Sequence, residues 1–157
     1  MATWEKFATE APDLAGVVRE RFQAFRHHVL ATVRHDGSPR VSGTEVSWWG
    51  ADLVIGSMPS ARKALDLRRD GRFALHVNPG DGSMEGGGDV KISGRAVEVV
   101  GAEQRAWVEE VRPPSPDSHL FRLDLTEAVT TAVSDDQTHL VITLWRPAEG
   151  IRTFHRA

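Results

Sequence analysis

The sequence predicts a mainly β protein in which short strands form an antiparallel barrel accompanied by a few helices. Many short segments have the alternation or the β-branched composition of strands, and tight turn signals separate several of them. Helical spacing of apolar residues appears in only three short segments. Because strands joined by hairpin turns pair antiparallel, these observations favour a barrel over a parallel sheet with crossover helices.

The first part of the chain is predicted to form one helix and then a hairpin. Asp13 is expected to cap the helix, whose apolar positions are Leu14, Val17, Val18, Phe22 and Phe25. At His28 the period changes to that of a strand, and the turn at residues 35–38 begins the return strand of a hairpin. The strands expected here cover residues 29–33, 40–49 and 53–57.

The second part alternates two helices with further strands. One helix begins at Ala61 and stops at Gly71, with Leu65 and Leu67 turned inward, and the other covers residues 102–111 around Trp107. The long strand 90–100 is interrupted at Ser93-Gly94, where a bulge or a close backbone contact is expected. The remaining strands are predicted at residues 73–77, 120–126 (extending towards Ala132), 140–145 and 151–155, and a loop at 79–89.

Length and composition limit the possible function classes. With 157 residues the chain is predicted to be a single domain, 1–157, with a helical N-terminal segment at 1–27. The absence of cysteine excludes disulfides, thiolate catalysis and cysteine-ligated metals. Neither a secretory signal nor a membrane-spanning run is recognisable, so we expect a cytoplasmic protein without a membrane partner. Because tyrosine is absent too, redox chemistry would need a borrowed cofactor.

Two adjacent tryptophans suggest an interface. On a strand the indoles of Trp48 and Trp49 must point to opposite faces. One is therefore expected in the core and the other towards solvent, a partner or a ligand. Since aromatic residues concentrate at subunit interfaces, we predict a homodimer.

Residues 57–65 (Ser-Met-Pro-Ser-Ala-Arg-Lys-Ala-Leu) predict an anion site. They join an apolar strand to a helix that opens near Ser60, and the first N–H groups of a helix lack internal partners. Arg62 and Lys63 lie in the first turn, where cations disfavour the helix dipole, and such a broken local rule often marks a functional site. With the hydroxyls of Ser57 and Ser60, these residues predict a phosphate cradle.

The order of several motifs resembles the pyridoxamine 5'-phosphate oxidase-like family, the flavin- and deazaflavin-binding split β-barrels. The resemblance covers about residues 15–157. The motifs that carry it are the hairpin segment 31–42, the Ser-x-x-x-x-Arg-Lys turn at 57–63, the segment 67–75, the strand 90–96 and the C-terminal Trp-Arg-Pro at 145–147.

The resemblance implies a role for each matching position. Arg62 and Lys63 would hold the cofactor phosphate, and Ser57 with Met58 would lie beside the ring and ribityl chain. Ser42 stands where the true oxidases usually carry an arginine, and it is neutral. A serine often found before the Arg-Lys pair is also replaced, by Ala61. These departures imply either looser FMN binding or the use of the deazaflavin coenzyme F-420.

The C-terminal segment bears on the substrate and on the subunit arrangement. It is basic but does not match the segment with which the true oxidases grip pyridoxine phosphate, so oxidation of pyridoxamine phosphate is not implied. Because the family's cofactor lies at a dimer seam, Trp145 and Arg152 are candidates for reaching the partner subunit's ring or substrate.

Other constellations carry weaker hypotheses. The seven histidines show no ligand spacing, so no metal site is predicted, and His76 is expected to be a packed, hydrogen-bonded side chain. A basic stretch at 62–72 lacks interleaved aromatics in a chain of net charge −3, so we expect no nucleic-acid partner. The loop from Gly80 to Gly88 is expected to be a flexible hairpin, and the less favoured alternative is that it covers the substrate.

Two functions remain open at the level of sequence. The first is an FMN- or coenzyme F-420-dependent oxidoreductase that transfers a hydride to or from a small organic substrate. The second is a non-catalytic module of the same fold that binds or carries a flavin or a haem-related ligand. No residue is an obligatory acid or base, so the sequence assigns no catalytic side chain and no particular substrate.

Overall fold

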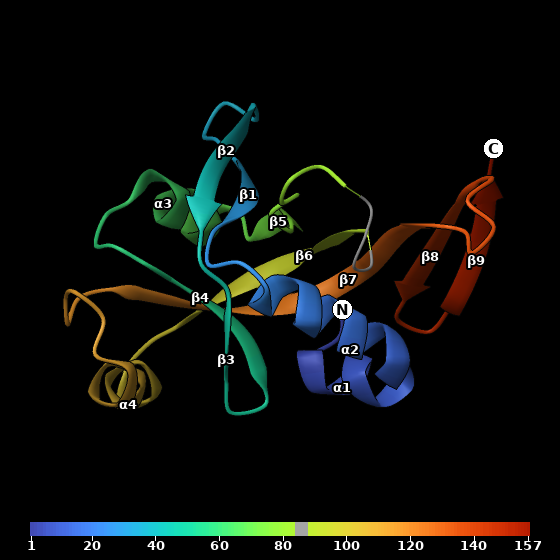
Figure 1. The fold of residues 1–157 in the computed structure, drawn as a ribbon. Helices are drawn as coiled ribbons and strands as arrows, with labels where there is room; N and C mark the ends of the chain where they lie inside the picture. Colours follow the sequence, from blue (N-terminus) through green and yellow to red (C-terminus); the bar gives the residue numbers. More distant parts are fainter. Residues whose placement is uncertain (84–87) are drawn as a thin grey trace.

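The computed structural model describes residues 1–83 and 88–157, and Figure 1 shows them as one sheet flanked by helices. In chain order the helices and strands are α1 (Trp4–Glu10), α2 (Pro12–Gln23), β1 (His28–Val33), β2 (Pro39–Thr44), β3 (Ser47–Trp49), β4 (Asp52–Ser57), α3 (Arg62–Arg69), β5 (Arg72–His76), β6 (Asp89–Val99), α4 (Ala102–Val111), β7 (His119–Val133), β8 (Leu140–Arg146) and β9 (Gly150–Arg156).

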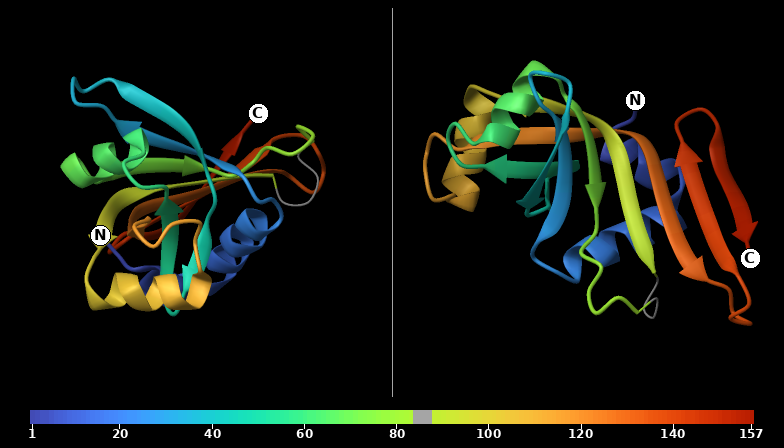
Figure 2. Two further views of the ribbon diagram at one scale, coloured as in Figure 1. Left: turned by 90° about the vertical axis from the view of Figure 1, so that its left-hand side faces the viewer. Right: turned by 90° about the horizontal axis from the view of Figure 1, so that it is seen from above.

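The strands form a curled antiparallel sheet, which confirms the predicted fold class. In the described parts of the chain, nine strands pair in the order β2-β1-β5-β6-β7-β4-β3, with β8 added to β7 and β9 to β8. Strand β7 is long enough to pair with strands at both of its ends: its first residues pair with β4 and its last residues pair with β8. Strands β2 and β3 end the order without pairing with each other, so the sheet stays open (Figure 2).

The core lies between the curled sheet and the N-terminal helices. Phe7 of α1 and Phe22 of α2 are fully buried there, and the Trp145 ring of β8 lies 4.6 Å from the Phe7 ring. Each fully buried aromatic side chain removes about 150–250 Å² from water. Helices α1 and α2 therefore form part of the hydrophobic core that holds β8 in place.

The N-terminal segment differs from the predicted single helix. It holds two helices, and the first, α1, is capped by the Thr3 hydroxyl, which accepts a hydrogen bond from the Lys6 N–H at 3.2 Å. Asp13 does not cap α2. The N-cap residue is Ala11, without a side-chain bond, and Pro12 starts the helix with its φ angle already fixed.

Two of the five apolar positions named for the predicted N-terminal helix lie on the surface of the protein. The buried stripe is Leu14, Val18 and Phe22, spaced four residues apart along one helix face. Val17 is 37% exposed, and Phe25, which follows the end of the helix, is 38% exposed. In α3 likewise Ala64 and Leu67 are buried whereas Leu65 is 37% exposed, so the inward prediction for Leu65 is wrong.

The two adjacent tryptophans occupy opposite faces of β3, as predicted, but neither is a free aromatic anchor. Trp48 packs on the main core, 5.1 Å from the Trp4 ring and 4.6 Å from the Arg19 guanidinium. Trp49 packs on the smaller cluster around Trp107, and its Nε1 donates to Glu110 at 2.8 Å. Both indoles have partners within the chain, so the dimer prediction loses this support. The predicted strand 40–49 is also interrupted, between β2 and β3.

Strand β6 has the irregularity predicted at Ser93-Gly94. Its register with β7 shifts there, so that Thr126 is the additional residue on β7. The prediction of a flexible hairpin from Gly80 to Gly88 falls partly on residues 84–87, which lie outside the described residues. None of the helices in the described ranges has the length and apolar composition needed to cross a membrane.

Candidate functional site

The predicted cradle lies where β4 gives way to α3, with β2 alongside. We use "the cradle" for Ser42, Ser57, Met58, Ser60, Arg62 and Lys63. Ser60 does not cap the helix, because α3 begins at Arg62 with Ala61 as its N-cap and no side chain bonds to the first turn. The first N–H groups of α3, which lie at the positive end of the helix dipole, therefore have no side-chain acceptor.

Lys63 is the best-placed cation of the cradle. Its side chain folds back onto β2, where the ammonium donates to the Gly43 carbonyl at 2.8 Å. Burial lowers the pKa of Lys63, and the Glu45 carboxylate opposes that shift more weakly. The contact brings Ser42, which precedes Gly43, next to α3, so the structure unites two predicted positions that lie 21 residues apart in sequence.

The other predicted cradle residues lie on the same loop. The Ser57 hydroxyl is nearly buried at the end of β4, 3.4 Å from the Met58 carbonyl, to which it donates. Met58 is 70% exposed, and Arg62 is exposed and has no hydrogen bond or ion pair within the described residues. These side chains surround the start of α3 and leave the Arg62 guanidinium available to an anion.

A histidine that the sequence analysis did not identify holds the cradle loop. Ser60 adopts a positive φ of 60°, unusual for a residue with a side chain, and its N–H donates to His119 Nε2 at 3.1 Å. Because Nε2 accepts this bond, the neutral ring must carry its proton on Nδ1, which lies 2.9 Å from a Glu98 carboxylate oxygen.

The carboxylate behind His119 is held in turn by an arginine. Arg68 of α3 donates two hydrogen bonds to Glu98, at 2.8 and 2.7 Å. The Arg68 guanidinium, helped by His119, outweighs the effect of burial and lowers the pKa of Glu98 to about 2. Glu98 is therefore ionised at neutral pH, and the series Arg68, Glu98, His119 fixes the backbone of the cradle loop from outside.

A buried carboxylate anchors α3 to the β1–β2 hairpin. Asp66 is 3% exposed and accepts hydrogen bonds from Thr32 at 2.8 Å, Arg40 at 2.6 Å and Arg69 at 3.1 Å. Burial alone would raise the pKa of Asp66, but the bonds from Arg40, Thr32 and Arg69 outweigh it and lower the pKa. This anchor sets the distance between α3 and β2 across which Lys63 reaches Gly43.

Trp145 and Arg152 do not join the cradle within one chain. They belong to β8 and β9, at the end of the sheet opposite to α3 (Figure 1). Trp145 is fully buried against Phe7, so in this conformation it has no surface with which to contact a second subunit. Its indole Nε1 lacks a hydrogen-bond partner within the described residues. Arg152 is exposed on β9.

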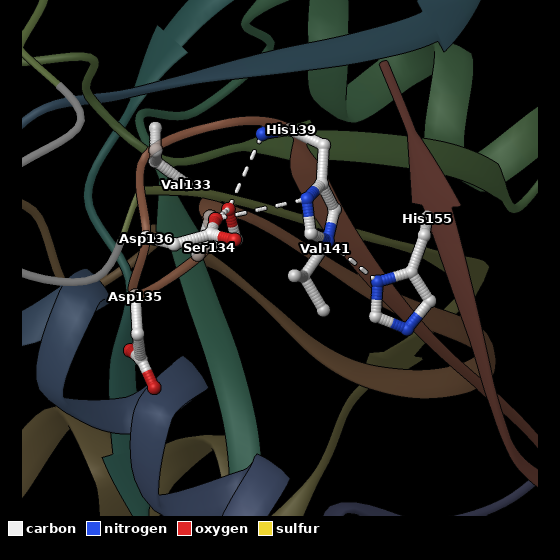
Figure 3. A pocket seen from close by; sticks show the side chains of 8 residues that line it. Val133, Ser134, Asp135, Asp136, His139, Val141 and His155 are labelled. Carbon is white, nitrogen blue, oxygen red and sulfur yellow. Dashed lines mark hydrogen bonds and ion pairs between the residues drawn. The ribbon is translucent and has the colours of Figure 1, made fainter.

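A separate hollow of about 560 Å³ lies beside the turn between β7 and β8 (Figure 3). Two imidazoles line it, with His139 Nε2 lying 2.8 Å from His155 Nδ1. Asp136 approaches His139 Nδ1 only to 3.9 Å. Across residues 1–83 and 88–157, no group of three or more histidine or carboxylate side chains has an arrangement that could hold a metal ion. The pair joins the β7–β8 turn to β9 by a hydrogen bond.

The family model described as pyridoxamine 5'-phosphate oxidase matches residues 14–132, most of the chain and all of the cradle. The chain belongs to this family. The open antiparallel sheet is accordingly the split β-barrel of the pyridoxamine 5'-phosphate oxidase family, as the motif order indicated. A search of the curated proteins finds no match.

Solved structures with the same fold have diverse described functions. PhzG from Burkholderia lata 383, in complex with tetrahydrophenazine-1-carboxylic acid, has a TM-score of 0.65 at 19% identity and covers 90% of this chain and 87% of its own. An F420 reductase has a TM-score of 0.51 at 20% identity, covering 64% and 86%. HutZ, the heme storage protein from Vibrio cholerae, has a TM-score of 0.54 at 18% identity, covering 74% and 89%. At these identities the likeness shows the fold alone.

Proposed function

We propose that the protein is an oxidoreductase that uses FMN or coenzyme F-420 to transfer a hydride to or from a small organic substrate. The observation that carries the proposal is the ammonium of Lys63, half-buried at an uncapped helix start and bonded to one carbonyl. An ammonium has three N–H donors, so two remain for an anion. A phosphate there would meet these donors, the first N–H groups of α3 and the Arg62 guanidinium, which has no partner among the described residues.

The remaining cradle residues would orient the cofactor. Ser42, Ser57 and Ser60 offer hydroxyls around the phosphate and ribityl chain, and exposed Met58 offers an apolar surface for the ring. His119 would keep the Ser60 backbone in place during binding. A bound flavin or deazaflavin supplies the hydride chemistry itself, so the protein needs only to bind, orient and shield it.

The neutral hydroxyl of Ser42 favours the deazaflavin over FMN. It stands beside the Lys63 contact where an arginine would add a second charge for the phosphate. A protein purified yellow with stoichiometric FMN would overturn this preference.

A non-catalytic binding module is the second candidate, favoured by the likeness in fold to a protein described as storing heme. The two candidates differ in turnover. Substrate-dependent bleaching of the bound chromophore supports the oxidoreductase, whereas tight binding without turnover against a broad substrate panel supports the module.

Removing the two cations of the cradle should remove cofactor binding. Charge-assisted hydrogen bonds contribute about 1.5–3 kcal/mol each, so Lys63→Ala should weaken affinity for FMN or F-420 roughly ten- to a hundredfold. The double variant Arg62→Ala/Lys63→Ala should nearly abolish binding and leave the fold intact, since Arg62 has no hydrogen bond or ion pair within the described ranges and Lys63 loses a single exposed hydrogen bond. Fluorescence titration with each cofactor measures the affinities.

Lys6→Ala is the matched control for this titration. Lys6 is an exposed lysine of α1 with only a 3.8 Å ion pair to Glu10, so its removal should leave cofactor affinity unchanged. Unchanged cofactor affinity in the double variant would show that the cradle does not bind the cofactor phosphate, whatever the activity of the protein.

We further propose a homodimer with the cofactor at its seam. Strand β9 is an edge strand whose seven residues are all exposed, and Ile151 and Phe154 keep 51% and 39% of their surface in water. An open strand edge presents unpaired N–H and C=O groups to a second chain, and exposed apolar patches mark interaction sites. A second copy would also bring Arg152 to a site that lies far from it within one chain.

Cofactor and dimer should therefore stabilise each other. If the cofactor contacts both subunits, its addition should shift dimer dissociation to lower protein concentration by mass action. Light scattering over a dilution series, with and without cofactor, measures this shift. A monomer that keeps full cofactor affinity at nanomolar concentration would rule out the arrangement.

A further inference from the structure

A second cluster of positive charge lies at the other end of α3. An open hollow of about 480 Å³ is formed there between the β1–β2 turn, the α3–β5 turn and β6. Four arginines line it, and one carboxylate accompanies them: Arg34, Arg69, Arg72, Arg95 and Asp70. We call this set the arginine hollow. Figure 2 shows the β1–β2 hairpin extending over α3 on this side of the molecule.

The arginine hollow carries a formal charge of +3 in a chain whose net charge is −3, since four guanidinium groups face one carboxylate. The Arg72 guanidinium, bonded to Asp70 at 2.7 Å, lowers the pKa of Asp70 to about 2. Asp70 is thus ionised and already paired. Its charge compensates Arg72, and Arg69 shares the buried Asp66 carboxylate with Arg40. Arg34 and Arg95 are therefore the two arginines of the hollow without an ion pair among the described residues.

The strand register places two of these charges directly opposite each other. Arg72 of β5 and Arg95 of β6 are cross-strand partners, and like charges in that relation destabilise a sheet. Arg95 makes no hydrogen bond or ion pair within residues 1–83 and 88–157, and the nearby Asp70 carboxylate is already bonded to Arg72. Two like charges that face each other without a carboxylate for the second are expected where a bound anion supplies the missing negative charge.

The other two guanidinium groups are already held in position. Arg69 donates to the Val33 carbonyl at 2.6 Å and to buried Asp66 at 3.1 Å, and Arg34 donates through Nε to the Pro39 carbonyl at 3.2 Å. Each guanidinium has five N–H donors, so both retain donors after these bonds. Because these two side chains are already ordered, less conformational entropy is lost when a ligand binds them than when it must order free side chains.

The turn beneath the arginine hollow is fixed by close backbone packing. A Cβ on Gly71 would lie 2.6 Å from the Ala96 carbonyl oxygen, and the Gly71 carbonyl accepts the Ala96 N–H at 2.7 Å. This contact presses the α3–β5 turn onto β6. It thereby brings Arg69 and Arg72 together with Arg95 on one surface.

We propose that the arginine hollow is a second anion site, specific for a compact ligand with two linked phosphates. Planar guanidinium groups bind phosphate oxygens in pairs, and a lining with a formal charge of +3 matches a diphosphate better than a single phosphate. The described lining contains no Phe or Trp and a single ring, the imidazole of His35, so we expect the guanidinium groups to recognise the diphosphate rather than a ring attached to it. This inference is independent of the cradle, which lies at the opposite end of α3.

Calorimetric titration with inorganic pyrophosphate tests the site, in the Arg62→Ala/Lys63→Ala background so that the cradle cannot contribute. We expect this background to bind pyrophosphate and the further change Arg95→Ala to weaken binding at least about tenfold. Arg105→Ala removes an exposed arginine of α4 and should change nothing. Equal affinities of the Arg95→Ala and Arg105→Ala variants, or no binding by the background, would overturn the proposal.

Titrations with four further ligands identify the ligand class. ADP should bind like pyrophosphate, whereas orthophosphate and sulfate at matched ionic strength should bind at least about tenfold more weakly. Equal binding of all four anions would mean nonspecific charge attraction and would overturn the proposal, as would binding of single-stranded DNA without binding of pyrophosphate. Without any ligand, Arg95→Ala should raise the unfolding temperature, because it removes the cross-strand repulsion.

Discussion

Replacing Asp66 by alanine is expected to destabilise the protein by about 3 kcal/mol. The variant would remove the acceptor of three hydrogen bonds and leave Arg40 and Arg69 without their carboxylate. Losing one partner of a buried ion pair costs about 3–5 kcal/mol, and the low end applies because the Arg40 side chain keeps 22% of its surface in water. Urea unfolding followed by tryptophan fluorescence measures the loss.

The same carboxylate predicts how stability depends on pH. The pKa of Asp66 is lowered in the folded state, so its contribution is fully present above the ordinary aspartate pKa of about 3.9. It is lost as the pH falls through the lower folded pKa. The stability of the wild type should therefore decline in acid more steeply than that of Asp66→Asn, and the two curves should converge.

Asp135→Ala provides the control for both measurements. Asp135 is exposed beside the β7–β8 turn, and its removal should change the free energy of unfolding by no more than about 0.5 kcal/mol. If Asp66→Ala matched this control, Asp66 would not anchor α3 to the hairpin. The positions of Lys63 and Arg69, which depend on α3, would then need another explanation.

Local signals in the sequence were sufficient for much of the fold and for part of the site. Helix α4 has the predicted bounds 102–111, and the bulge lies where Ser93-Gly94 indicated it. The strand–turn–helix segment around Arg62 could be predicted because neighbouring residues specify it: an apolar run, turn residues and helical spacing.

The contacts that hold the site could not be predicted in the same way, because they join distant residues. His119 lies 59 residues from Ser60, whose N–H it accepts, and Asp66 lies 34 residues from Thr32. Only the pairing of β4 with β7 places His119 beside the cradle loop. A single sequence gives no indication of such pairings, and an isolated histidine or aspartate has no diagnostic spacing.

The sequence also did not determine which apolar residues of the short helices are buried. In the eight residues of α3, helical spacing alone allows Leu65 or Leu67 to face the core, and packing against β1 and β6 selects Leu67. Helix α1 was not predicted, because seven residues give little periodicity. It is stabilised by the burial of Trp4 and Phe7 against the rest of the protein.

Gly94→Ala is expected to be among the most damaging single substitutions in the sheet, although the change is one methyl group. A Cβ at Gly94 would overlap the Asp124 carbonyl oxygen of β7, far inside van der Waals contact. The obstacle is backbone and cannot rotate away, so β6 and β7 must separate at the bulge. We expect a loss of about 3 kcal/mol, the upper end for overpacked sites.

The same glycine-to-alanine change in α2 is expected to have the opposite effect on the free energy of unfolding. Gly16 lies on the exposed face of that helix, and an added methyl group would have no heavy atom within 4 Å. Gly16→Ala should therefore stabilise the protein by about 0.5–1 kcal/mol through helix propensity. Urea unfolding of both variants compares them directly.

The damage at Gly94 should extend to cofactor binding, because the β6–β7 register also sets Glu98 against His119. A Gly94→Ala variant as stable as Gly16→Ala would show that β6 and β7 do not approach this closely at the bulge.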